Sequence, residues 1–193
     1  QDLTTQGKRI EVKKMQIGLL HAGRSEADRI SISGEVDRAK SDPGALKGES
    51  KSLDLQPLLR FVGKEPAADA PDLLAQNVKF DVVPLQEGRY EIRNLSADVA
   101  QGHVVCENFA FQKVEKQDPK LEWRGFKAEK MNMDTLLANV APEKRGYLSG
   151  SGKMESEGTM QGFTPEARAK NMRVKATGSI SDGKIQNVPM AKE

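Results

Sequence analysis

The chain has 193 residues, of which 37% are hydrophobic and 30% are charged, and the charges nearly cancel to a net +2. This balance argues against a dedicated nucleic-acid-binding protein, which needs a clustered basic face to meet the phosphates. No apolar run approaches the ~20 residues that a membrane-spanning helix needs, and the pattern of a signal peptide is absent. If the protein is held at a membrane, we expect the anchor to lie outside these residues.

Apolar residues alternate with polar and charged ones along most of the chain, which predicts half-buried antiparallel strands. The first such segments carry Ile10, Val12, Met15, Ile17 and Leu19, and then Ile30, Ile32, Gly34 and Val36. The later segments carry Val78, Phe80, Val82, Tyr90, Ile92, Leu95, Ala97, Val99, Val104, Cys106, Phe109, Phe111, Leu121 and Trp123. The alternation changes phase at Asn94, which predicts a bulge or bend there. The short turns between these segments favour an antiparallel meander and a mainly β fold with a few short helices.

Two short segments between the strands resemble each other. Residues 53–62 align with residues 131–140 without a gap, and both read apolar, Asp or Asn, apolar, polar, any, Leu, Leu, any, any, Val. We expect short helices near Pro57–Val62 and Asp134–Val140, each ending a repeated sheet unit and plugging one end or edge of the sheet. In such a repeat, Leu59 and Leu137 are buried at equivalent places.

These segments suggest how the chain is divided. A first β unit covers residues 1–64, a linker rich in Ala, Pro and Asp covers 65–77, and a second β unit covers 78–142. A strand, a helix and a hairpin are expected in residues 143–193. We expect all parts to form one continuous domain.

The C-terminal third has its own local signals. Thr164 can cap a helix that begins at Pro165 and extends to Asn171, because proline loses nothing at the first helical position. A strand is expected to follow over residues 172–180. The Asp182-Gly183 pair then predicts a tight hairpin turn with Gly183 at positive φ, leading into a last strand over Lys184–Pro189.

The glycine spacing of this third resembles the C-terminal region of AsmA-like proteins of the bacterial envelope. The residues that carry the resemblance are Leu148–Gly152, Gly158, Gly162–Pro165 and Ala176–Ile185. The chain departs from that pattern at Ala167, Ala169 and Met172, where bulkier leucines are usual, and after Pro189, where an apolar strand would follow. The resemblance is close over the last third and loose over the rest.

The resemblance implies a long, curved antiparallel sheet in the periplasm, anchored to the inner membrane by a preceding helix. It also implies a part in outer-membrane biogenesis and phospholipid movement. Bridge-like lipid-transfer proteins, which AsmA-like proteins resemble, hold acyl chains in a concave apolar groove. The resemblance brings no individual site residues, because such a groove acts through its continuous apolar surface.

The sequence offers no arrangement of residues for catalysis. His21, His103 and Cys106 are too few and too far apart to form a metal site with ordinary ligand spacing. Cys106 follows two valines and is expected to be a small core residue, since no nearby cation would lower its pKa. Gly150-Ser151-Gly152 lacks the spacing of a nucleophile elbow. We therefore expect no enzyme, no metal and no cofactor.

An amphipathic sheet must cover its apolar face with another sheet, with helices or with an apolar ligand. Because few helices are expected, either the sheet folds over on itself or part of this face stays open as a groove. The first case describes a structural or adhesin-like protein-interaction domain with a closed core. The second describes a domain that binds phospholipid acyl chains. The candidate groove residues are Val78, Phe80, Val82, Ile92, Val104, Phe109 and Phe111.

Overall fold

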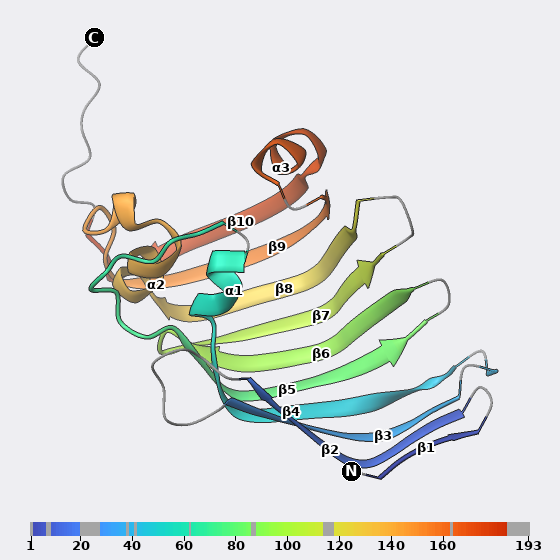
Figure 1. Ribbon diagram of the computed structural model, residues 1–193. Coiled ribbons are helices and arrows are strands. Elements are labelled where there is room, and N and C mark those ends of the chain that lie inside the picture. The colour runs from blue at the N-terminus through green and yellow to red at the C-terminus, as the bar shows by residue number, and fades with distance from the viewer. Residues whose placement is uncertain are drawn as a thin grey trace.

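The computed structural model describes residues 2–6, 9–19, 28–37, 39–40, 42–61, 63–85, 88–113, 118–162 and 164–184. Its strands form one antiparallel sheet of ten strands, which follow one another in strict sequence order (Figure 1). The sheet is open, with β1 at one edge and β10 at the other. This arrangement confirms the expected mainly β class, the antiparallel meander and the small helical content.

The strands are long and the helices short. The strands are β1 (Asp2–Gln6), β2 (Arg9–Leu19), β3 (Asp28–Asp37), β4 (Gly44–Asp54), β5 (Leu74–Pro84), β6 (Arg89–Val99), β7 (Gly102–Gln112), β8 (Lys120–Asn132), β9 (Ser151–Gln161) and β10 (Arg173–Ser181). The helices are α1 (Gln56–Phe61), α2 (Met133–Val140), the 3-10 turn η1 (Pro142–Lys144) and α3 (Pro165–Asn171). The sheet curves along its strand order, and α1 and α2 lie on the inner side of the curve near one end (Figure 1).

Bulges keep the apolar side chains of the strands on one face. Asn94 has φ 53°, and the register between β5 and β6 shifts beside it, between Lys79 and Asp81. This confirms the predicted irregularity at Asn94. Gly125 has φ 63° in β8, where the register with β9 shifts between Trp123 and Phe126. Each bulge adds one residue and so reverses the alternation, which brings apolar residues of both halves of a strand to the same face.

The two helices that follow β4 and β8 both begin beside a side chain that accepts a backbone hydrogen bond, although from the residue two positions on in α1 and three positions on in α2. The side chain of Asp54 accepts a hydrogen bond from the backbone N–H of Gln56 at 3.0 Å, and Asn132 accepts one from Thr135 at 3.0 Å. Asp54 and Asn132 are equivalent positions of the predicted repeat, and four strands precede each helix. Leu137 is buried, whereas Leu59 is half-buried against the core. The order of elements therefore matches the repeat, although the two leucines differ in exposure.

The core lies where α1 and α2 cover the sheet. Its buried residues are Leu73, Ala75, Val78, Ala97, Val99, Ala128 and Met131. Leu55, Leu59 and Leu136, from the helices and the chain beside them, pack against this cluster. The helices therefore close one end of the inner face of the sheet.

A fully buried asparagine joins the parts of this plug. Asn139 in α2 accepts a hydrogen bond from the Gln56 side chain at 3.1 Å and donates to the carbonyl oxygens of Pro71 and Thr135, both at 3.0 Å. It is 0% exposed. The segment between α1 and β5, within the range expected to be a linker, is thus bound to α2. In the same segment, both carboxylate oxygens of Asp69 accept hydrogen bonds from the Nη1 atom of Arg145, at 2.7 and 2.8 Å.

The C-terminal signals are confirmed in part. Thr164 accepts a hydrogen bond from the backbone N–H of Ala167 at 3.2 Å, as expected of the residue that caps α3. The predicted hairpin at Asp182-Gly183 is wrong. Asp182, with φ 51°, takes the left-handed conformation and Gly183 does not. The backbone N–H of Ser149 donates to the carbonyl of Lys184, so the chain continues beside Gly150 with one extra residue, as in a bulge, and does not turn back.

Some predicted positions lie outside the described residues. They are Val62, at the end of the first expected helix, His21, and residues 185–189 of the expected last strand.

Candidate functional site: the apolar face

Apolar side chains of neighbouring strands lie opposite one another on the inner face of the sheet. Val82 pairs with Ile92, Ile92 with Phe109, and Phe109 with Trp123, which makes a continuous row across β5 to β8. A second row joins Tyr90, Phe111, Leu121 and Met160. Directly opposed residues of antiparallel strands share a face. We call these two rows, together with Phe80, the apolar face.

The structure divides the seven candidate groove residues into two groups. Val78 is 4% exposed and belongs to the core beneath α1 and α2, and Phe80 and Val104 pack against that core. Val82, Ile92, Phe109 and Phe111 are half-buried and continue the face beyond the core. The first group therefore lies in or against the core beneath the helices, with Phe80 at its border, and the second group lies on the part of the face beyond the core.

Aromatic rings on this face cover glycines of the neighbouring strands. A Cβ added to Gly48 would collide with the ring of Phe80, its partner on β5, and one added to Gly158 would collide with the ring of Trp123. The Trp123 indole N–H donates to the Ser156 hydroxyl at 3.1 Å. The rings thus lie over the two glycines, whose missing side chains leave room for them.

Several residues of this face were missing from the sequence-based set. They are Tyr90, Leu121, Trp123 and Met160. The alternating pattern marked the first three as strand residues. Their place in the two rows depends on the pairing register and on the bulge at Gly125, which the alternation alone does not reveal.

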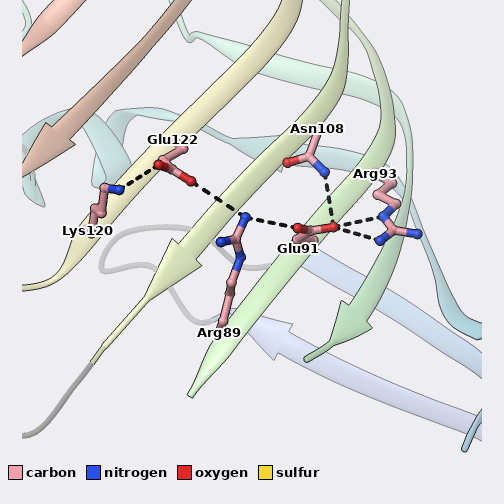
Figure 2. A network of polar contacts seen from close by, with 6 residues as sticks. All are labelled: Arg89, Glu91, Arg93, Asn108, Lys120 and Glu122. Carbon is pink, nitrogen blue, oxygen red and sulfur yellow. Dashed lines mark hydrogen bonds and ion pairs between the residues drawn. The ribbon is translucent and has the colours of Figure 1, made fainter. Parts of the chain in front are cut away.

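The opposite face of the sheet carries a network of charges (Figure 2). Glu91, only 7% exposed, accepts hydrogen bonds from Arg93 at 2.8 and 2.9 Å and from Asn108 at 3.1 Å. Arg89 bridges Glu91 and Glu122, and Lys120 pairs with Glu122 at 2.7 Å. Each carboxylate therefore contacts at least two cations or hydrogen-bond donors. The network places charged side chains over the outer face of the sheet.

The pKa values in this network follow from these contacts. Burial raises the pKa of the Glu91 carboxyl, but the hydrogen bonds from Arg93 and Asn108 and the positive charges of Arg93 and Arg89 outweigh burial, so this pKa is lowered. The hydrogen bond and the charge of Lys120 likewise lower the pKa of Glu122. Both groups are therefore held as carboxylates, which does not suit a general acid.

Cys106 and His103 have ordinary structural surroundings. The Cys106 thiol is buried, and burial raises its pKa while it bonds weakly to the carbonyl oxygens of Asn108 and Arg124 at 3.3 and 3.5 Å. This agrees with its expected role as a small core residue. His103 contacts Asp98 at 2.8 Å on the exposed side of the sheet. Within the described part of the chain, no group of three or more His, Cys, Asp or Glu side chains is placed to hold a metal ion.

The comparisons with known proteins add no relative. No family model, no curated protein and no solved structure matches the chain. Among the residues that the structure describes, no helix combines the length and apolar character needed to cross a membrane.

Proposed function

We propose that the apolar face binds the acyl chains of phospholipids without selecting individual lipid species. The observation that carries this proposal is the extension of the apolar rows beyond the helical plug. Over the described residues, α1 and α2 pack on the core at one end, and the rows from Val82 to Trp123 and from Tyr90 to Met160 lie outside that core.

The chemistry of this face suits an acyl chain. Its side chains are aliphatic and aromatic, and Tyr90 is 46% exposed. A large exposed apolar patch is unusual on a monomeric protein and normally marks a binding surface. Each buried CH₂ group contributes about 0.8 kcal/mol without needing a directional partner. A lipid tail can therefore gain affinity from contact area alone, which explains why no polar cluster is needed on this face.

The cellular setting is proposed from the resemblance to AsmA-like proteins. We place the domain in the periplasm, on a protein anchored to the inner membrane, with a part in outer-membrane biogenesis or phospholipid transport. The curved, open sheet agrees with the architecture that this resemblance implies.

Binding of a fluorescent fatty-acyl probe tests the proposal. Phe109→Asp places a charge in the middle of the first row and is expected to reduce probe affinity at least tenfold. Gln112→Asp is the matched control, because Gln112 lies on the same strand and pairs with Arg89 and Lys120, whose charges accept a carboxylate. The control should bind like the wild type.

Native mass spectrometry of the purified protein is a second measurement and should reveal co-purified phospholipid. If the wild type carries no lipid and binds no probe, the acyl-chain proposal fails. The alternative, a structural or adhesin-like domain that binds other proteins, would then take its place.

A further inference from the structure

Among the residues that the structure describes, the outer edge of β10 pairs with no other strand. β10 ends the strand order of the sheet. Its inner side pairs with β9 without a register shift from Arg173 to Ser181, and all of these β10 residues are exposed. The other side of such a strand presents a row of free N–H and C=O groups, which can pair with another strand.

The usual devices that protect an edge are missing from β10. Residues 173–181 contain no proline, no bulge and no residue at positive φ. Lys175, the kind of charge that discourages pairing, lies 3.7 Å from the Glu157 carboxylate of its own sheet. The Arg173 guanidinium donates to the carbonyl oxygens of Lys170 and Met172. Both cationic side chains of β10 therefore contact groups of their own chain.

Exposed apolar side chains gather beside this edge. Of the seven large hydrophobic residues that are exposed in the described chain, four are Met154, Met172, Val174 and Ile180. Val174 and Ile180 lie opposite Gly158 and Gly152 of β9, so no β9 side chain stands directly opposite them. Their exposed fractions are 47% and 41%. A strand paired to the outer edge would bring side chains next to both.

We propose that β10 is a homodimerisation strand that pairs antiparallel with β10 of a second copy, centred on Thr177. In this register Val174 lies opposite the partner's Ile180, so apolar side chains meet on the inner face. On the outer face, Lys175 lies opposite the partner's Ser179, so like charges do not oppose one another. The strand is thus complementary to itself in this register.

A second β10 fits this edge better than the other edge of the sheet does. β1 has five residues and β10 has nine, so a β1 strand would leave part of the edge unpaired. Pairing of β10 with β1 would also leave a free β10 at one end and a free β1 at the other, so it would continue into an open filament, whereas the two-fold pair uses both β10 edges and closes. The two-fold axis is normal to the sheet, so the apolar faces of both copies lie on the same side. The dimer does not depend on the proposed lipid binding.

Charge variants at the two-fold axis test this proposal. Thr177 is exposed, and in the proposed dimer it faces its own copy. Sedimentation velocity over micromolar to millimolar concentrations should show a monomer–dimer equilibrium for the wild type. Thr177→Lys and Thr177→Glu should each weaken dimerisation at least tenfold, and an equimolar mixture of the two should recover a heterodimer. Gln76→Lys, on the exposed part of β5, is the matched control and should dimerise like the wild type.

Three results would overturn the proposal. They are a wild type that stays monomeric throughout this range, a dimer that tolerates both charges, and a mixture that does not associate. Disulfide formation is a separate measurement that fixes the register: Thr177→Cys should form an intermolecular disulfide under mild oxidation, and the buried Cys106 should not compete with it. If Thr177→Cys forms no disulfide while Ser181→Cys does, the centred register is wrong and the proposal fails.

Discussion

Glu91 shows how a single carboxylate can be buried on the outer face of an open sheet. Its oxygens accept hydrogen bonds from Arg89, Arg93 and Asn108. Hydrogen bonds to a charged group stabilise a fold more than neutral ones do, and an unpaired buried donor carries a further cost. The Arg89 Nε atom is already buried without a partner. Loss of the carboxylate would therefore leave the cations of this patch poorly compensated.

We expect Glu91→Gln to lower the free energy of unfolding by about 1–3 kcal/mol at neutral pH. Because the pKa of Glu91 is lowered by folding, its stabilising contribution is present above the ordinary carboxyl pKa of about 4.3 and is lost as the pH falls through the folded-state value. The difference between the variant and the wild type should therefore shrink in acid. Urea unfolding at several pH values measures it.

Glu107→Gln serves as the control for this experiment, because Glu107 is an exposed carboxylate on the neighbouring strand. It should change the stability by less than about 0.5 kcal/mol. Equal losses for Glu91→Gln and Glu107→Gln would show that the network contributes only general charge effects.

At the scale of elements, α1 and α2 each contain a Leu-Leu pair, and the two pairs differ in burial: both leucines of α2 pack inward, whereas α1 has one exposed member. Leu137 is 9% exposed, whereas Leu58 in α1 is 61% exposed. Leu137→Ala removes packing against the plug and should cost about 2–5 kcal/mol of unfolding free energy. Leu58→Ala is the matched control and should cost less than about 0.5 kcal/mol. Thermal or urea unfolding distinguishes them, and similar losses would contradict the assigned packing of the helices.

The alternation of apolar residues predicted most of the strands, because each face of a pleated strand recurs every second residue. It did not mark β1 or β4, where the apolar residues do not alternate clearly. Thr164 marked the beginning of α3 for a similarly local reason, because its side chain caps the backbone of the helix that follows it. The Asp182-Gly183 pair misled because the same dipeptide suits a hairpin and a bulge, and the choice depends on whether the chain keeps pairing with Ser149. That pairing joins residues distant in sequence, which local chemistry does not encode.

The candidate face was likewise predicted only in part. Ile92 and Phe109 alternate in sequence and do lie opposite each other. Val78 alternates in the same way but lies under the helices. Whether an inward residue is covered depends on where α1 and α2 pack, and this is a property of the tertiary structure. Trp123 joined the face because β8 follows β7 in the sheet and Gly125 bulges behind it.

For the whole molecule, the central claim is that an acyl chain lies along the apolar face, and Trp123 is placed to report it. Trp123 is the single tryptophan of the chain, and it lies opposite Phe109 in the first row. An acyl chain on this face would pass within van der Waals distance of the indole ring. Bromine atoms on an acyl chain quench tryptophan fluorescence only at such short range.

The most direct test is the fluorescence of Trp123 during titration with a phospholipid brominated on its acyl chain, compared with the same lipid without bromine. The account predicts saturable quenching by the brominated lipid alone, and its loss in Phe109→Asp. Unchanged emission with the brominated lipid, at concentrations where the protein remains folded, would contradict acyl-chain binding at this face.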